Sequence, residues 1–371
     1  MSTLGAVERA ECPTIGIAGL EATGVIQLGR GKVISKGDLA STPGRYPVYS
    51  SAKENDGKFG EYGLFMFDEE LISWSVDGGG ALFHRPKHRF SITNVGGFIR
   101  ILKPERIFCR YLYFALSHLH SQVKFDWVRK AHPSVIRNVY TDIPLPNLDE
   151  QKRIVSVLDE AFAALDRARA NAEENLRAAR DLFHAELQRQ FGSAREDADV
   201  LPFESICEPL TPTVKLKRQD YLDEGTYPVV SQEADLISGY WNDPSAVMSI
   251  EGPVVVFGDH TCCLKYVDFD FVVGADGTKV LRPFEGVAAK FLYYGLRSQP
   301  IQQTGYARHF KLLRETSLPK LSIQEQRRIT EHLDEMDTES GKLAKAYEGK
   351  LTDIAALRQS LLQAAFSGQL T

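Results

Sequence analysis

The hydrophobic and polar positions of the chain define two kinds of segment, and the same order of segments occurs twice. Short runs of β-branched and aromatic residues, bounded by glycine and proline, predict strands over 72–76, 98–102, 254–257 and 269–273. Apolar residues at helical spacing predict short helices at 111–116 and 291–296. Each set is followed by a polar stretch of about 40 residues whose apolar positions predict one long helix.

Three sequence landmarks return in the same order. RYPVYS at 45–50 returns as TYPVVS at 226–231, YLYFAL at 111–116 as FLYYGL at 291–296, and EQKRI at 150–154 as EQRRI at 325–329. The displacements are 181, 180 and 175 residues, which indicates a duplicated unit. We therefore expect an α+β fold in which two similar domains and two long helices form an internal pseudo-twofold repeat.

The landmarks also predict the limits of the segments. We expect a first domain at 1–146, a central helical spacer at 147–195, a second domain at 196–318 and a C-terminal helical spacer at 319–371. Asp149 and Ser322 are expected to cap the two long helices. Gly192 is expected to end the first of them, with 193–199 as a linker. A helix over 151–190 would contain 40 residues and be about 60 Å long.

Apolar residues lie seven positions apart along each long helix. One row of the first helix holds Leu158, Leu165, Ala172 and Ala179. The rows of the second helix hold Leu333, Tyr347, Ile354 and Leu361, and Met336, Leu343, Leu357 and Ala364. Two rows at 3.5-residue spacing predict a coiled-coil seam, and we expect the two matched helices to pair with each other. For either helix alone, packing on its own domain is an equal alternative.

Composition narrows the class of protein. With 371 residues, 43% hydrophobic and 25% charged, the chain has the composition of a globular protein of two or three domains. It has no apolar stretch of the roughly 18 residues that a membrane helix needs. Glu8, Arg9 and Glu11 stand where the apolar core of a secretory signal would lie. Five cysteines, an odd number, favour a reduced, cytoplasmic chain.

The net charge of −5 excludes a strongly basic nucleic-acid-binding protein, so any binding to DNA must depend on local patches. Residues 1–146 carry 18 basic and 14 acidic side chains, whereas residues 196–318 carry 11 and 18. The first domain is therefore the more basic of the two.

The sequence lacks the common catalytic motifs. It has no P-loop, no completed dinucleotide fingerprint, no HExxH, no GxSxG and no adjacent prolines. Asp268, Asp270, Asp276 and Lys279 form a loose set of carboxylates and a lysine like that of a nuclease, although acidic residues that bracket a strand and a turn are commonplace. We expect a protein without catalysis of its own and without a bound metal.

Two similar domains on paired helices could contact DNA at sites one or more turns apart, about 34 Å per turn. Clustered basic residues would contact phosphates, and polar residues at turns could reach base edges. The candidates in the first domain are Lys32, Lys36, Ser50, Ser51, Lys53, Trp74, Arg85, Lys87, Arg89, Arg129 and Lys130. Those in the second are Ser231, Gln232, Asp259, His260, Thr261, Lys265, Arg308, His309 and Lys311. For each residue alone, a solvated charge or a turn-stabilising side chain is the alternative.

Several motifs resemble the specificity subunit of Type I restriction–modification enzymes. They are PLPNLDEQKRI at 144–154, LPKLSIQEQRRI at 318–329 and LRQSLLQAAFSGQL at 357–370, together with VVVFGDHT at 254–261 and DFVVGADG at 270–277. The resemblance implies a phage-defence subunit with two target-recognition domains separated by an antiparallel pair of long helices. Each domain would read one half of a split, asymmetric target in double-stranded DNA.

The resemblance also implies partners. Two methyltransferase subunits would bring S-adenosylmethionine, and motor-nuclease subunits using ATP with Mg could join them. On this chain the residues expected to organise that assembly are Glu150, Gln151, Arg153, Glu325, Gln326 and Arg328. Two other functions stay open: a scaffold or anti-restriction protein that binds the methyltransferase without DNA, and a metal-dependent nuclease using Asp268, Asp276 and Lys279.

Overall fold

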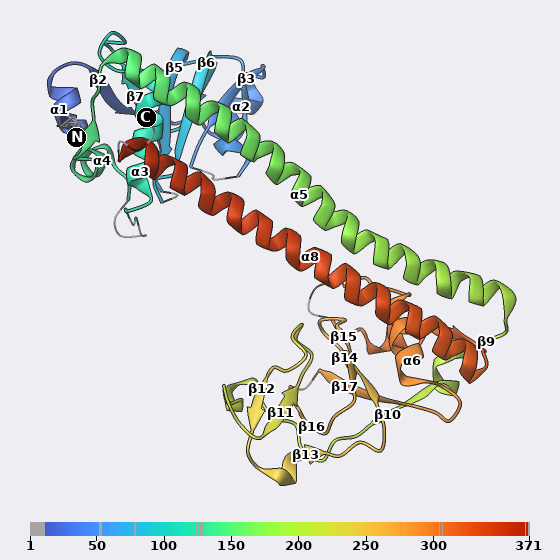
Figure 1. Ribbon diagram of the computed structural model, residues 1–371. Helices are drawn as coiled ribbons and strands as arrows, with labels where there is room; N and C mark the ends of the chain where they lie inside the picture. Colours follow the sequence, from blue (N-terminus) through green and yellow to red (C-terminus); the bar gives the residue numbers. More distant parts are fainter. Residues whose placement is uncertain are drawn as a thin grey trace, which may run out of the picture. The chain divides into compact units, whose positions relative to one another are not determined.

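The computed structural model describes residues 12–51, 54–77, 79–123, 125, 130–275, 277–303, 305, 307–367 and 369. The chain forms two compact units, whose elements are labelled in Figure 1. The first comprises Met1–Asn171 with Leu351–Thr371, and the second comprises Ala172–Lys350. Each combines sheet and helix, so the predicted α+β class is confirmed.

The first unit is built on a six-stranded sheet in the order β2-β7-β5-β6-β3-β4. The strands are β2 (Ile26–Arg30), β3 (Tyr46–Tyr49), β4 (Lys58–Tyr62), β5 (Phe67–Ser75), β6 (Leu82–Ile92) and β7 (Gly96–Ile101). Neighbours are antiparallel except β3 and β6, which run parallel. The sheet curls strongly, because Phe67 contacts Phe98 with ring centroids 4.9 Å apart although the register partner of Phe98 is Ser73. A register shift between Glu69 and Leu71 contributes to this curl.

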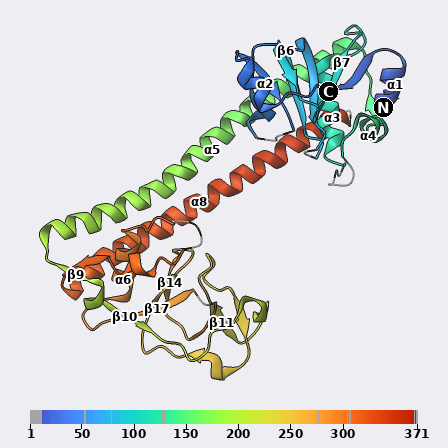
Figure 2. The ribbon, with the colours of Figure 1, turned by 180° about the vertical axis from the view of Figure 1, so that it is seen from behind.

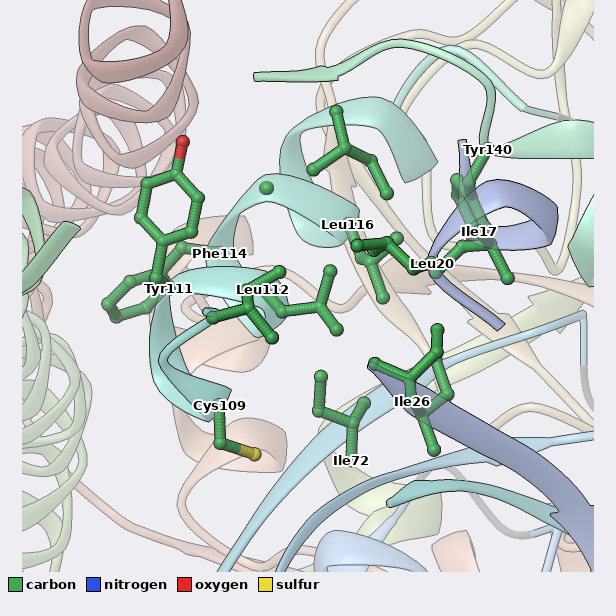
Figure 3. Packing of buried hydrophobic residues seen from close by; sticks show 14 of the residues in the cluster. Ile17, Leu20, Ile26, Ile72, Cys109, Tyr111, Leu112, Phe114, Leu116 and Tyr140 are labelled. Carbon is green, nitrogen blue, oxygen red and sulfur yellow. The ribbon is translucent and has the colours of Figure 1, made fainter. Parts of the chain in front are cut away.

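Helices cover the sheet of the first unit with apolar side chains. Figure 3 shows Ile17 and Leu20 of α1 (Ile17–Ala22) and Leu112 of α3 (Cys109–His120) packed with Ile26 and Ile72 of the sheet. Three other parts complete the unit before the first long helix: α2 (Lys36–Ser41), α4 (Pro133–Val139) and the pair β1 (Thr14–Ile15) with β8 (Ile143–Pro144).

The second unit contains two four-stranded sheets. One has the order β10 (Cys207–Leu210), β17 (Thr278–Pro283), β14 (Val254–Gly258) and β15 (Leu264–Val267). The other has the order β12 (Gly239–Trp241), β11 (Tyr227–Val230), β16 (Phe271–Val273) and β13 (Val247–Met248). The helices α6 (Ala289–Arg297) and α7 (Phe310–Leu313) follow, and β9 (Val200–Pro202) pairs with β18 (Ser317–Pro319).

Strand pairing confirms the duplication. In the first unit β3 and β6 pair in parallel at Val48↔Ser91 and Tyr49↔Ile92. In the second unit β11 and β16 pair in parallel at Val229↔Val272 and Val230↔Val273. Each of the four paired residues in the second unit stands 181 positions after its counterpart in the first unit. The predicted strands and the short helices α3 and α6 are likewise confirmed.

The two long helices are α5 (Leu148–Asp197, 50 residues) and α8 (Ile323–Phe366, 44 residues). Within the second unit Arg180 of α5 pairs with Glu348 of α8 at 2.8 Å, and Glu186 pairs with His332 at 2.8 Å. Since the positions rise along one helix and fall along the other, the helices run antiparallel here. Within the first unit Asp166 of α5 pairs with Arg358 of α8 at 2.8 Å.

The last turns of α8 belong to the core of the first unit. Both ribbon views place the end of α8 beside α3 (Figure 1, Figure 2). The ring of Phe366 lies 5.5 Å from that of Tyr111, measured between centroids. Leu362 and Ala365 are buried in the same apolar cluster as Tyr111. The first unit is therefore assembled from both ends of the chain.

Two details of the first long helix differ from the sequence prediction, and one of the second is confirmed. The first helix does not end at Gly192 but continues to Asp197, so residues 193–197 of the predicted linker are helical. In this segment the NH2 of Arg195 donates to the carbonyl of Ser317 at 3.1 Å. The N-terminal cap of this helix is Asn147, whose Oδ1 accepts from the N–H of Glu150 at 2.9 Å, and not Asp149. The predicted cap at Ser322 is confirmed by reciprocal hydrogen bonds between Ser322 and Glu325.

The predicted seam is only partly correct. Leu158, Ala172, Ala179 and Leu333 are buried, whereas Leu343 and Leu357 are 46% and 49% exposed. A straight α-helix has 3.6 residues per turn, so positions seven apart drift by about 20° per heptad. One of the two predicted rows on α8 therefore turns towards solvent in the middle of the helix.

Candidate nucleic-acid interface

In the first unit, loops from five parts of the chain meet where β3 and β6 end. We call them the first loop cluster: residues 31–32, 50–51, 75–77, 93–96 and 130–131. Four backbone N–H groups donate across it at 2.9 to 3.0 Å: Lys32 to Ile92, Thr93 to Tyr49, Val76 to Val95 and Ala131 to Val76. The loops are therefore held as one framework.

The second unit has an equivalent framework. The second loop cluster comprises residues 216, 231–232, 258–261, 274–275, 277 and 307–309. Four backbone N–H groups donate across it at 2.7 to 3.0 Å: Leu216 to Val273, Gly274 to Val230, Asp259 to Gly277 and His309 to Asp259. Each of these bonds corresponds to one in the first cluster, so the duplication extends to the backbone of the turns.

In each cluster a hydroxyl group donates to one loop carbonyl, although the two hydroxyls come from non-equivalent positions. The Oγ of Ser75 donates to the carbonyl of Ser51 at 2.9 Å, and the Oγ1 of Thr261 donates to the carbonyl of Gln232. Ser51 and Gln232 are equivalent positions, 181 residues apart. Their backbones are therefore fixed alike while their side chains differ.

Many of the predicted DNA-contacting residues lie in these clusters. Ser50, Ser51, Gln232, His260 and Thr261 are half-buried there, while Lys32, Lys130 and Arg308 are exposed. Lys36 and Lys311 are exposed on the neighbouring helices α2 and α7. Lys130 pairs with Asp77 at 3.1 Å. Lys53 and Arg129 lie outside the described residues.

Two candidates of the first unit are wrong, because they are part of its core. Trp74 is 1% exposed, and its indole Nε1 donates to the carbonyl of Ala131 at 2.7 Å. Arg85 is 4% exposed. Its guanidinium lies 3.6 Å from the ring centroid of Tyr49 and donates to the carbonyl of Asp56 at 2.6 Å. Burial lowers the pKa of Arg85.

Four candidates of the second unit are also buried and support the framework. The carboxylate of Asp259 accepts from the N–H of Phe310 at 2.7 Å, and the carbonyl of Asp259 accepts from the Nδ1 of His309 at 3.0 Å. Ser231 shares a hydrogen bond of 2.7 Å with Ser238. Lys265 donates to the carbonyl of Asp235, and burial lowers its pKa. The side chains of these four residues are not available to a ligand.

Lys87 and Arg89 lie on β6 rather than in the first loop cluster. Lys87 is exposed. Arg89 is exposed as well, pairs with Asp68 at 3.1 Å and lies over the ring of Phe65, 4.9 Å from its centroid. The surface around Lys87 and Arg89 on β6, an interior strand of the sheet, is therefore basic and aromatic.

The residues predicted to bind partners behave in two ways. Gln151 and Gln326 are buried, so their prediction as direct partner contacts is wrong. The Oε1 of Gln151 accepts from the N–H of Phe108 at 2.8 Å, and its Nε2 donates to the carbonyls of Arg106 and Pro146. Gln326 repeats this arrangement: its Oε1 accepts from Ala288 at 2.8 Å, and its Nε2 donates to Gly286 and Leu321. Each glutamine thus fastens a long helix to its own unit.

The charged neighbours of these glutamines remain at the surface. Arg153 and Arg328 are exposed, and Arg153 pairs with Glu150 at 2.7 Å. Glu325 is exposed and engaged in the cap of α8 with Ser322. These four charged side chains are accessible to a partner.

Each unit also has a cavity of about 510 Å³ beside its long helices, a feature that was not predicted from the sequence. In the first, Arg110 of α3 binds Asp159 of α5 at 2.6 Å. In the second, Lys290 of α6 binds Asp334 of α8. Asp159 and Asp334 belong to the repeated Leu-Asp pair that follows EQKRI and EQRRI. The repeated Leu-Asp pair could have indicated that these two carboxylates have equivalent roles, although it does not show which group each carboxylate binds.

The carboxylates considered for a nuclease are engaged elsewhere or exposed. Asp270 accepts from the Oγ of Ser249 at 3.0 Å and from the N–H of Ile250 at 2.9 Å. Asp268 is exposed, and the Nζ of Lys279 lies 5.2 Å from the ring centroid of Phe310. Asp276 lies outside the described residues. Of the described residues of this set, Asp270 stabilises a turn and Lys279 lies over an aromatic ring.

Glu70, His84 and Cys109 have the spacing of a metal site. Hydrogen bonds nevertheless occupy both ring nitrogens of His84: Nε2 lies 2.6 Å from Glu70, and Nδ1 lies 2.9 Å from the NH1 of Arg110. Since Arg110 can only donate, the Nδ1 of His84 accepts its hydrogen bond. The Nε2 of His84 therefore carries the hydrogen and donates to the carboxylate of Glu70. His84 in this state has no free lone pair for a metal.

No helix within the described ranges is long and apolar enough to cross a membrane.

Comparison with known proteins gives a consistent result. A family profile described as "Type I restriction modification DNA specificity domain" matches residues 20–174. A putative type I specificity subunit of Mycoplasma pneumoniae is 31% identical over 137 residues, which are 36% of this chain and 53% of that protein. A second protein of the same organism, named as the N-terminus of a putative type I specificity subunit, is 31% identical over 139 residues, which are 36% of this chain and 72% of that protein. The chain thus spans about half the length of the first relative.

A solved structure supports the fold. It comes from work on complex assembly and conformational transition of the type I R-M system, and it matches with a TM-score of 0.64 and 17% identity. The match covers 98% of this chain and 100% of the other. At this identity the likeness concerns the fold alone.

Proposed function

Because the chain belongs to the family of Type I restriction–modification specificity subunits, we propose that it is the DNA-recognition subunit of a Type I restriction–modification complex. It binds double-stranded DNA, reads a split asymmetric target with its two units and carries no catalysis of its own. The observation that supports this most is the pair of loop clusters, which share a backbone framework and differ in their polar side chains. Such a pair offers two different patterns of donors and acceptors to two half-sites.

The surface charges suit this role locally. Lys32, Lys36 and Lys130 are exposed at or beside the first loop cluster, and Arg308 and Lys311 at or beside the second. Contacts of these groups with phosphates would position the duplex and make binding dependent on salt, without selecting a sequence. Residues 196–318 carry more acidic than basic side chains, so attraction of phosphates in the second unit depends more strongly on Arg308 and Lys311.

We place the catalytic groups on partner subunits. Two methyltransferase subunits bring S-adenosylmethionine, and motor-nuclease subunits bring ATP with Mg. The two units carry equivalent surfaces around Glu150 and Arg153 and around Glu325 and Arg328, which suits two copies of one partner. The compartment is the cytoplasm, where five unpaired thiols stay reduced.

Co-expression with the methyltransferase encoded beside its gene, followed by sequencing of methylated adenines, tests this function. We expect a split motif, and we expect only one half of it to change when residues 1–146 are exchanged for those of a relative. A stable complex that produces no methylation motif would contradict DNA recognition and support the scaffold function. Failure to form any complex would contradict both.

A further inference from the structure

The two loop clusters differ most informatively at Ser51 and Gln232. The backbone around each position is held in a similar way. A hydroxyl, from Ser75 or Thr261, donates to the carbonyl of the residue. Two positions earlier, the carbonyl of Tyr49 or Val230 accepts from the N–H of Thr93 or Gly274. The backbone framework is therefore shared by the two units, and the side chains of Ser51 and Gln232 differ between them. A position of this kind can change the ligand pattern without changing the fold.

The carboxamide of Gln232 is seated in a defined place. A Cβ on Gly277 would lie 2.2 Å from its Oε1, and a Cβ on Gly258 would lie 2.8 Å from the carbonyl oxygen of Gln232. Real Cβ atoms do not approach so closely, so glycine at both positions makes room for this residue. The side chain is half-buried, so part of it reaches solvent.

Hydrogen bonding determines which end of the carboxamide is left for a ligand. The backbone N–H of His260 donates to the Oε1 of Gln232 at 3.3 Å. A backbone N–H can only donate, so the oxygen must face it and the Nε2 group must face away. Gln232 therefore presents hydrogen-bond donors beyond the framework. Ser51 presents a hydroxyl, which can donate or accept.

We infer that Gln232 determines one base of the half-site read by the second unit, and that it does so as a donor. This inference rests on the proposed function. In the major groove a donor matches the N7 and O6 of guanine, the N7 of adenine or the O4 of thymine, whereas the amino groups of cytosine and adenine require an acceptor. Ser51 holds the equivalent place in the first unit and acts on the other half-site.

The test uses Gln232→Glu in the full chain, co-expressed with the same methyltransferase, with the methylated motif as the readout. Glutamate keeps an oxygen for the N–H of His260 and replaces the donor by an acceptor. We expect one position of one half-site to change towards a base pair that presents an amino group, by about 5- to 150-fold in relative methylation, which is the discrimination of about 1–3 kcal/mol that a good base contact provides. Gln232→Ser, which introduces the residue of the first unit, should relax the same position.

Two controls separate the possible outcomes. The other half-site should stay unchanged in each variant, and Gln188→Glu on the exposed surface of α5 should leave both halves unchanged. A wild-type split motif that neither Gln232 variant alters would overturn the inference and leave the proposed function intact. Loss of all methylation in both variants would also overturn it, because it would show a supporting role. A wild-type chain without a split motif would instead refute the proposed function.

Discussion

Replacing the buried glutamines should loosen each long helix from its own unit. Gln151→Ala removes three hydrogen bonds from a side chain with no exposed surface, and it leaves the N–H of Phe108 without its acceptor. Each such bond contributes about 1 kcal/mol net, and a buried group left unpaired adds to the loss. We therefore expect the free energy of unfolding to fall by about 3 kcal/mol. Gln326→Ala breaks the equivalent three bonds, so we expect a similar loss.

Urea unfolding measures the loss, and hydrogen exchange read by mass spectrometry locates it. Gln151→Ala should speed exchange in α3 of the first unit, and Gln326→Ala should speed it in α6 of the second. Gln188→Ala, the same change at an exposed position of α5, should alter stability by less than about 0.5 kcal/mol. Losses below about 1 kcal/mol for both buried glutamines would refute the reasoning, since that is the contribution of a single bond.

Three further predictions concern charged groups. Arg85→Ala should lower the free energy of unfolding by about 2–4 kcal/mol in urea, because a packed and bonded side chain is lost, without changing the salt dependence of DNA binding. Arg308→Ala should do the opposite, reducing the slope of log Kd against log salt by about one at unchanged stability. The hydrogen bond from Arg189, with those from Gln190 and His332, lowers the pKa of Glu186 to about 2. The ionised carboxylate of Glu186 therefore contributes its full stabilisation above the ordinary pKa of a glutamate, and this stabilisation is lost as the pH falls towards 2. Between pH 5 and pH 3 the wild-type protein should lose more stability than Glu186→Gln.

Each of these has a clear contrary result. A reduced salt slope for Arg85→Ala would place its guanidinium on DNA and contradict its burial. An unchanged slope for Arg308→Ala would remove it from the interface. Equal acid sensitivity of wild type and Glu186→Gln would show that the contacts of Glu186 with Arg189 and His332 do not stabilise the fold.

The architecture followed from the sequence where the signal extended over many residues. Landmarks such as RYPVYS and TYPVVS are separated by nearly constant displacements, and the helical period persists over α5 and α8. The turn positions that meet in the loop clusters were also accessible, because glycine and polar residues mark the ends of strands. Neither inference depended on the direction of a particular side chain.

Side-chain direction is what the sequence could not supply. Trp74 and Arg85 are residue types common on binding surfaces, yet Trp74 packs in the apolar cluster of the first unit and the guanidinium of Arg85 is held by Tyr49 and Asp56. Gln151 on α5 is a second example. Its repetition as Gln326 indicated that the position matters, but it did not indicate that both side chains are buried. These outcomes depend on contacts with distant segments, which local patterns do not encode.

The first unit takes Leu362, Ala365 and Phe366 from the last turns of α8. During synthesis its sheet emerges from the ribosome first, yet its core cannot close until these residues have been made. The second unit is one continuous stretch, Ala172–Lys350, and is complete earlier. The unit that is begun first is therefore finished last, and until then the apolar surface of α3 around Tyr111 is open to chaperones and proteases.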